Sequence, residues 1–233
     1  MHKYVIMGIQ GCGKGTQAKM LIKDFPIVHI SVGDIFRWHI QSHTKLAAKI
    51  GRATAAGELV SDDIVEEIVE GRLQQHDWNF GFILDGFPRN RRQAGFFLES
   101  YDINAVIHID VPDQVVLDRV MNRRLCSKCG LDYNLIFHRP ANPDVCDVCG
   151  GALLTRADDN QQAVLARLSD YHAKTKPILD LFSRKELIVS VDGTHSSGEV
   201  QAEIRRKLGL DPIAAAMALR VNHEPAAASA AAN

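Results

Sequence analysis

The sequence predicts an α/β fold in which a doubly wound parallel sheet is covered by helices on both faces. Five apolar runs of strand length recur between stretches of helix length, and they lack the strict alternation typical of a strand with one exposed face. The runs occupy residues 4–7, 27–30, 82–84, 105–109 and 187–191. Parallel strands joined by right-handed crossovers bind ligands at their carboxyl ends, so the functional site should lie there.

Capping residues mark helix starts between these runs. Ser61, followed by Asp62 and Asp63, has the pattern of an N-cap with an acidic first turn. Pro112 begins another helix, which we expect to continue toward Arg124. Both helices fall between predicted strands, as the crossovers of a doubly wound sheet require.

Length and charge limit the organisation of the chain. Its 233 residues could form one sizeable domain with an insertion, or two small domains. With 27 basic and 28 acidic residues the charge is balanced, which argues against a general affinity for nucleic acid or an anionic membrane. No apolar run approaches the ~20 residues of a membrane span, and the first run is too short for a signal peptide. We therefore expect a cytoplasmic protein, and an odd number of cysteines fits a reducing compartment.

Two stretches depart from the alternation of strands and helices. Residues 125–155 are rich in Cys, Gly, Pro and Asn without a long helical period, which indicates a compact insertion. The tail at 211–233 is alanine-rich and poor in core-forming residues. We expect a short helix through Leu219 at most, with the last ten residues disordered.

A glycine-rich loop follows the first strand directly and leads into a helix at residues 17–25. Residues 8–16 read G-I-Q-G-C-G-K-G-T, and glycines let a backbone turn with several N–H groups facing a phosphate chain. Lys14 can reach the β- and γ-phosphates, and the Thr16 hydroxyl can bind Mg²⁺. The general phosphate-loop pattern has Ser or Thr directly after the lysine, whereas Gly15 stands here. The alternative interpretation is a strand–helix turn without a ligand.

Four cysteines in the insertion have metal-ligand spacing. Cys126 and Cys129 form one C-x-x-C pair, Cys146 and Cys149 form a second, and sixteen residues separate them. This spacing suits four thiolates around one tetrahedral Zn²⁺. Four protein ligands leave no open position, so the metal should be structural and should fold the insertion. A redox pair or scattered buried cysteines are the alternatives.

An acidic residue ends the third predicted strand. Asp85 is followed by Gly-Phe-Pro-Arg, and a carboxylate at this end of a buried strand beside a phosphate loop can hold Mg²⁺ directly or through water. Its alternative role is that of a turn or capping residue.

Arginines recur near strand ends and beside the insertion, where they could form a row of rigid forks around phosphates. They are Arg37, Arg89, Arg119, Arg123, Arg156 and Arg167. Each alone could equally be a solvated surface residue. No Ser-His-Asp or Cys-His grouping with a supporting motif accompanies them. Phosphoryl transfer to an acceptor that is already an anionic phosphate needs no general base, only alignment and neutralised charge.

These motifs together closely resemble the adenylate kinase family of nucleoside monophosphate kinases. The resemblance rests on G-x-x-G-x-G-K-G-T, on S-V-G-D-I-F-R at 31–37, on D-G-F-P-R with Gln93 four residues beyond Arg89, and on R-A-D-D-N at 156–160. It covers nearly all of residues 1–210, and the four-cysteine insertion is similar to the zinc-bearing lid of the long bacterial-type forms. It implies a five-stranded parallel sheet of the P-loop NTPase type.

The resemblance also implies a division into parts. The core would comprise 1–31, 60–122 and 157–210, with an AMP-binding flap at 32–60 and a zinc-binding lid at 123–156. The implied reaction is reversible transfer of the γ-phosphoryl group of MgATP to AMP, giving two ADP by direct in-line transfer. The family is usually monomeric, so we expect a monomer that binds ATP, AMP and ADP but neither nucleic acid nor membrane.

Residue roles follow from the same resemblance. The implied ATP site contains Gly11, Cys12, Gly13, Lys14, Gly15, Thr16, Arg119, Arg123, Asp132, Tyr133 and His195. The implied AMP site contains Ser31, Val32, Arg37, Glu58, Leu59, Val60, Gly86, Phe87, Pro88, Arg89, Gln93, Arg156 and Arg167. The implied catalytic set is Lys14, Arg89, Arg123, Arg156, Arg167, Asp158 and Asp159, in which the two aspartates orient arginines as the lid closes. Thr16 and Asp85 would hold Mg²⁺, directly or through water.

Two positions depart from or add to the family pattern. Val32 stands where the family usually has threonine, so a hydroxyl near the acceptor base is replaced by a methyl group. Gln93 still favours adenine, since its amide can pair with an edge that offers both N–H and N. Cys12 adds a thiol to the phosphate loop, either open to oxidation or buried and structural.

Two other functions remain open from the sequence. One is a sister kinase that uses UMP, CMP or GMP, which Gln93 and D-G-F-P-R disfavour. The other is a non-enzymatic ATP-dependent switch whose zinc ribbon binds a partner, which the absence of a basic patch disfavours.

Overall fold

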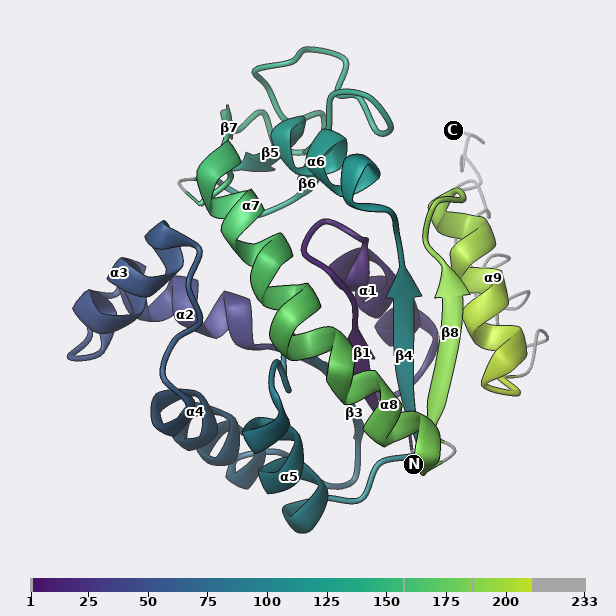
Figure 1. The fold of residues 1–233 in the computed structure, drawn as a ribbon. Helices are drawn as coiled ribbons and strands as arrows, with labels where there is room; N and C mark the ends of the chain where they lie inside the picture. Colours follow the sequence, from purple (N-terminus) through teal and green to yellow (C-terminus); the bar gives the residue numbers. More distant parts are fainter. Residues whose placement is uncertain (1, 157, 186, 211–233) are drawn as a thin grey trace, which may run out of the picture.

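A five-stranded parallel sheet forms the centre of the molecule (Figure 1), in a computed structural model that describes residues 2–156, 158–185 and 187–210. In spatial order the strands are β2 (Ile27–Ser31), β3 (Gly81–Asp85), β1 (Lys3–Met7), β4 (Ala105–Asp110) and β8 (Ile188–Asp192). All four neighbouring pairs are parallel. The predicted doubly wound sheet is confirmed, and each predicted run forms a strand.

Helices cover both faces of this sheet, as predicted. They are α1 (Lys14–Asp24), α2 (Val32–Gln41), α3 (Ala47–Ala56), α4 (Asp62–Gln74), α5 (Arg91–Ser100), α6 (Asp113–Met121), α7 (Gln161–Asp170), α8 (Lys176–Arg184) and α9 (Ser197–Lys207). Alternate residues of β1 face opposite sides, so Tyr4 and Ile6 pack with α1, α6, α7 and α9. Val5 and Met7 pack with the remaining helices. Two apolar cores therefore hold the sheet between them.

Helix boundaries differ from expectation at two places. The helix expected to reach Arg124 ends at Met121, because Asn122 closes it with hydrogen bonds to Asp118 and Arg123 then begins a strand. Ser61 occupies the N-cap of α4, but its side chain accepts no capping hydrogen bond. The acidic first turn of α4 is present as predicted.

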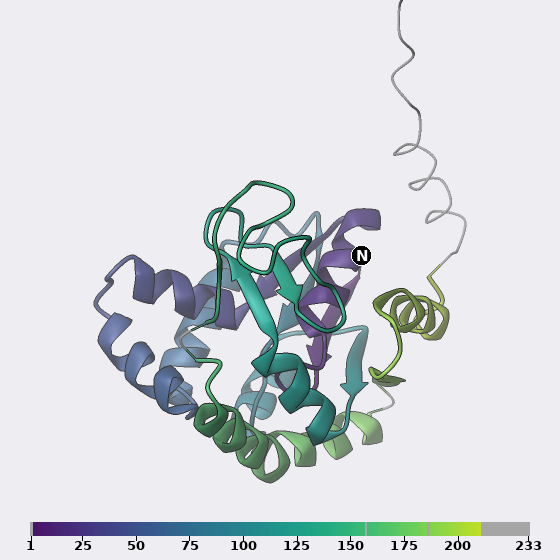
Figure 2. The same cartoon turned by 90° about the horizontal axis from the view of Figure 1, so that it is seen from above.

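The segment 123–156 forms a separate three-stranded antiparallel sheet, and no helix interrupts it. Its strands are β5 (Arg123–Cys126), β6 (Asp132–Asn134) and β7 (Leu153–Leu154), with β5 in the middle. Figure 1 shows this small sheet above the carboxyl ends of the central strands, and Figure 2 looks down on it, with α2 and α3 to one side and α9 to the other. We refer to this segment as the lid and to 32–60, which contains α2 and α3, as the flap.

A long helical rod crosses the molecule from the lid to the far end of the sheet (Figure 1). It consists of α7, a π-helical turn at Tyr171–Thr175 and α8. Single π-helical turns are frequent at functional sites because they shift the direction of the side chains that follow. The expected tail at 211–233 lies outside the described residues. Within the described ranges, no helix has both the length and the apolarity needed to cross a membrane.

Candidate active site

The phosphate loop lies between β1 and α1, at the carboxyl end of the sheet. Gly8, Gly11 and Gly13 have positive φ of 141°, 84° and 106°. A Cβ at Gly8 would lie 2.5 Å from the carbonyl oxygen of Ile109, so only glycine fits there. Lys14 is the first residue of α1, and its Nζ donates to the carbonyl oxygens of residues 8 and 9, at 2.7 and 2.8 Å. The ammonium group is therefore held within the curve of the loop, at a helix N-terminus suited to anions.

Asp85 ends β3 beside this loop, as predicted. Its Oδ2 lies 3.8 Å from the position that a Cβ of Gly15 would take and 3.4 Å from Nε2 of His29. Asp85 and Thr16 line the same cleft. A carboxylate and a hydroxyl beside a phosphate loop form an oxygen donor set that fits Mg²⁺, with phosphate oxygens and water as the remaining ligands.

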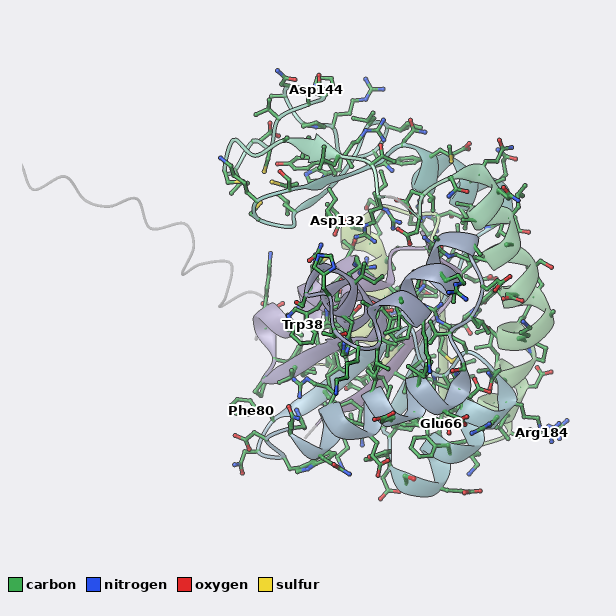
Figure 3. The ribbon with its side chains drawn as sticks, turned by 90° about the vertical axis from the view of Figure 1, so that its left-hand side faces the viewer. Trp38, Glu66, Phe80, Asp132, Asp144 and Arg184 are labelled. Atoms are coloured by element: carbon green, nitrogen blue, oxygen red, sulfur yellow. The ribbon has the colours of Figure 1, made fainter. Side chains whose placement is uncertain are left out.

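One large cleft, between the phosphate loop, the flap and the lid, brings most of the sequence-predicted residues together. Figure 3 labels Trp38 of α2 and Asp132 of the lid, which both line it. The predicted residues along it are Gly11, Cys12, Gly13, Lys14, Gly15, Thr16, Ser31, Arg37, Glu58, Leu59, Val60, Asp85, Gly86, Phe87, Pro88, Arg89, Arg119, Arg123, Cys126, Asp132, Tyr133, Arg156, Asp158, Arg167 and His195. Asp159 does not line it, because its side chain is fully buried behind Arg123.

Four arginines of the cleft are paired with carboxylates that set their directions. Arg123 Nε donates to Asp159 Oδ2 at 2.8 Å, and a second bond joins the same two groups. The other pairs are Arg156 with Asp132 at 2.8 Å, Arg167 with Asp158 at 2.9 Å, and Arg37 with Asp34. Charge-assisted bonds of this kind pre-orient the guanidinium groups, whose remaining N–H groups can bind phosphate.

The arginines are close enough to affect one another. Burial lowers the pKa of Arg89 below its usual range, and the positive charges of Arg167 and Arg37 lower it further. Burial, followed by the charges of Arg123 and Arg37, does the same to the pKa of Arg156. Nε of Arg156 is buried and has no hydrogen-bond partner among the described residues. Crowded guanidinium groups with an unpartnered donor indicate a site built for a multiply charged anion.

The pKa of Asp158 is set by the same arginines. Burial alone would raise the pKa of this carboxyl, but four arginines, of which Arg167 contributes most, outweigh burial and lower it below its usual range. Asp158 therefore stays ionised and keeps its bond to Arg167.

A smaller, largely apolar pocket adjoins the cleft on the flap side. Its walls come from α2, α4, α5, the segment after α3, and the turn after β3. They are Val32, Phe36, Leu59, Val60, Val65, Gly86, Arg89 and Gln93. Val32 is 1% exposed and packs in the core beneath the flap. Arg89 and Gln93 are the polar side chains among these walls.

Arg119 joins the phosphate loop to the loop after β8. Its guanidinium group donates to the carbonyl oxygens of Cys12, at 3.4 Å, and Gly193, at 2.8 Å, and it lies 5.6 Å from the ring centre of Phe137 in the lid. Cys12 is 2% exposed, and this burial raises the pKa of its thiol. His195 remains exposed near Asp192.

Three residues with long-range hydrogen bonds were missed by sequence reasoning. Gln10, within the phosphate loop, accepts from Arg167 at 2.7 Å and donates to Asp159 at 3.3 Å. Gln17 donates to the carbonyl oxygen of Ser197 at 3.0 Å. The Thr175 hydroxyl donates to the carbonyl oxygen of Arg89 at 2.7 Å. Gln10 lies inside the phosphate-loop motif, so its position alone could have marked it as a candidate. Gln17 and Thr175 bond to partners far away in the sequence, and no local pattern identifies them.

The four lid cysteines come together as predicted. Their sulfur atoms all lie within 4.8 Å of one another, with Cys126 to Cys149 at 3.4 Å and Cys129 to Cys146 at 3.7 Å. A tetrahedral zinc with Zn–S bonds of about 2.3 Å gives sulfur separations of about 3.8 Å. The arrangement therefore fits one zinc ion with four thiolate ligands.

Two equivalent turns shape this metal centre. Each C-x-x-C pair is followed by a glycine with positive φ, Gly130 at 69° and Gly150 at 66°. The N–H of each glycine donates to the backbone carbonyl oxygen of the first cysteine of its pair. The hydroxyl group of Tyr133 lies 3.5 Å from the sulfur of Cys146, and together with the backbone N–H groups of Cys149 and Val148 it lowers the pKa of that thiol to about 6. Tyr133 is 3% exposed, so its side chain packs inside the lid, although the residue also borders the cleft.

Comparisons with known proteins agree with this geometry. The sequence model described as adenylate kinase matches residues 6–187. An adenylate kinase of Caldicellulosiruptor bescii is 41% identical over 214 residues, which cover 90% of this chain and all of the relative. Those of Clostridium tetani and Staphylococcus aureus are each 40% identical, over 88% and 86% of this chain and 97% and 95% of the relatives. The chain belongs to the adenylate kinase family.

Proposed function

We propose that this chain catalyses the reversible transfer of the γ-phosphoryl group of MgATP to AMP, giving two molecules of ADP. The observation that carries the proposal is a cluster of five arginines between the phosphate loop and the apolar pocket. They come from the flap, the core and the lid, and they are Arg37, Arg89, Arg123, Arg156 and Arg167. A phosphate loop alone binds one nucleotide. A second pocket across an arginine cluster supports a second nucleotide that faces the first.

On the donor side, the phosphate loop would hold the ATP phosphates through its N–H groups, with Lys14 on the transferred group. Arg119 would lie against the adenine, and the loop at Gly193 and His195 would border the base. From the lid, Arg123, Asp132 and Tyr133 would contact ATP. Bound Mg²⁺, held by Thr16 and Asp85, would neutralise charge on the phosphate oxygens.

On the acceptor side, the apolar pocket would hold the adenine of AMP. Val32 and the residues at 58–60 would pack against the ring, while the Gln93 amide reads its polar edge. Arg37 and Arg89 would bind the AMP phosphate. Ser31 and residues 86–88 border this site.

The transfer then needs alignment and charge neutralisation, but no general base. An oxygen of the AMP phosphate attacks the γ-phosphorus, and the bond between that phosphorus and the β–γ bridging oxygen breaks, leaving ADP on each side. The acceptor oxygen is already ionised, so no proton has to be removed. Arg156 and Arg167 would bridge the two nucleotides, and closure of the lid and flap would exclude water and so suppress hydrolysis of ATP.

We further propose that the lid holds one structural zinc ion, that a single chain is the active unit, and that the protein works in the cytoplasm. Every side chain in the proposed mechanism comes from one chain, which supports a monomer. Thiolate ligands and the free thiol of Cys12 are suited to a reducing compartment.

The activity is tested by offering the purified protein MgATP with AMP, UMP, CMP or GMP and quantifying all nucleotides. We expect AMP to be converted to ADP with a kcat/KM at least about tenfold above that for any other acceptor. A higher value for another nucleoside monophosphate would identify a sister kinase instead. Absence of any transfer would leave only an ATP-binding role.

A second prediction concerns Asp159. Replacement by asparagine should lower kcat about tenfold, because Arg123 loses one of its two hydrogen bonds and the charge assistance of the other. Steady-state rates with both nucleotides saturating provide the measurement. Asp113→Asn is the matched control, since Asp113 pairs on the surface with His172 at 2.9 Å. An unchanged kcat in folded Asp159→Asn protein would remove the positioning role of Asp159.

A further inference from the structure

Gln93 is the polar side chain of the acceptor pocket that would pair with the nucleotide base. Its amide can face a base in two orientations. Adenine offers an acceptor at N1 and a donor at N6, while hypoxanthine, the base of IMP, offers a donor at N1 and an acceptor at O6. Rotating a glutamine amide by 180° exchanges its oxygen and its NH₂ group. A freely rotating Gln93 could therefore pair with either base, and selectivity requires that its orientation be set by the protein.

Two neighbours of Gln93 set that orientation. The backbone N–H of Arg89, which can only donate, is 2.7 Å from Gln93 Oε1. The carboxylate of Asp62, an acceptor, is 2.7 Å from Gln93 Nε2. The reversed amide would place oxygen against carboxylate and NH₂ against N–H, and Gln93 is only 1% exposed, so water cannot compensate for either conflict.

Asp62 is itself held in place by a third residue. The same carboxylate oxygen, Oδ1, accepts from Asn90 Nδ2 at 2.7 Å. Oδ1 of Asn90 accepts the backbone N–H of Gln93 at 3.0 Å as the N-cap of α5, so the orientation of Asn90 is also determined. The hydrogen bonds of Asp62, Asn90 and Gln93 thus join the start of α4 to the start of α5, directly behind the acceptor pocket.

We propose that Asp62 is a specificity-determining positioning residue, which acts with the backbone N–H of Arg89 to fix the Gln93 amide so that only an adenine-type edge pairs with it. The inference rests on the proposed function, in which Gln93 reads the acceptor base. After these two bonds, Gln93 still has one N–H on Nε2 and one lone pair on Oε1 free for hydrogen bonds. The edge of adenine offers one acceptor and one donor, which match them. Asp62 reaches the nucleotide only through Gln93.

The test measures kcat/KM for AMP and for IMP at saturating MgATP in the full-length protein. In Asp62→Ala we expect the AMP-to-IMP ratio to fall about tenfold and KM for AMP to rise, while KM for ATP stays within about twofold. Asp63→Ala is the matched control, because Asp63 occupies the same first turn of α4 but pairs with Arg92 at the surface. We expect that control to keep the parental ratio.

A double-mutant cycle separates this inference from the proposed function. Gln93→Leu should abolish most of the AMP preference, and adding Asp62→Ala to it should lower the ratio no further, since Asp62 acts through Gln93. If Gln93→Leu loses the preference and Asp62→Ala keeps it, the inference is overturned and the role of Gln93 stands. If Gln93→Leu keeps the preference, Gln93 does not read the base and the inference is overturned with it.

If Asp62→Ala melts at a much lower temperature than the parent, Asp62→Asn provides a second test. Its amide can accept from Gln93 in one orientation and donate to it in the other, so the orientation is less restricted without loss of volume. We expect the AMP-to-IMP ratio to fall in the same direction by a smaller factor. A parental ratio in folded Asp62→Asn and Asp62→Ala proteins would overturn the proposal.

Discussion

Replacement of Lys14 by methionine should lower kcat by about two to three orders of magnitude. The ammonium group lies within the phosphate loop, bonded to the carbonyl oxygens of Gly8 and Ile9, where it can follow the phosphoryl group during transfer. Methionine has a similar length but no charge, so it removes the electrostatic interaction and preserves packing. The melting temperature should change by only a few degrees, because Gly8 borders the open cleft and the carbonyl oxygen of Ile9 still accepts from the backbone N–H of Cys12.

Single-turnover and steady-state rates, together with a thermal melt, test this expectation. Lys185→Met is the control, since Lys185 is exposed at the end of α8 and does not line the cleft. A folded Lys14→Met protein that turns over within about threefold of the parent would exclude Lys14 from the transfer step.

Removal of the lid metal should have the largest effect on stability. The apolar cluster at the centre of the lid consists of four buried side chains, and two of them, Cys126 and Cys146, are proposed zinc ligands. Without the metal, Tyr133 and Leu153 bury too little apolar surface to fold three short strands. Chelation should therefore unfold the lid and lower the first melting transition by about 10 °C, which corresponds to a loss of about 3 to 4 kcal/mol.

Zinc content and a thermal melt provide the measurement. We expect about one zinc per chain in the parent and almost none in Cys146→Ser, with the same lowered transition as after chelation. Cys12→Ala is the control, because Cys12 lies in the phosphate loop, outside the cluster, and should retain the metal. A zinc-free parent protein of unchanged stability would contradict the structural role.

The strands were predictable because burial on both faces makes their sequences continuously apolar. β1, β3 and β4 are nearly inaccessible along their lengths, so their sequences are almost continuously apolar, with His108 as the polar residue inside β4. Their order was not predictable, since nothing in an apolar run identifies its neighbours. The end of α6 was also missed, because Arg123 and Arg124 suit a helix and become a strand only by pairing with Asn134 and Tyr133 across the lid.

The candidate site shows the same division. Lys14, Asp85 and the arginines lie in local motifs, so their chemistry could be proposed from the sequence. Asp62 could be assigned only to a helix start, because its bond to Gln93 spans 31 positions and forms after α4 and α5 have packed together. Short-range patterns thus identify the groups that bear chemistry, while folding determines which residues orient them.

The pairing of β5 with β7 makes the lid an exchangeable module. Leu125 lies opposite Leu154 in an antiparallel ladder, so the chain leaves the core and returns to it at neighbouring backbone positions. Between such positions, doubling the length of a loop costs only about 0.6 kcal/mol of closure entropy. Insertions and deletions can therefore accumulate there during evolution while the central sheet and its phosphate loop stay intact.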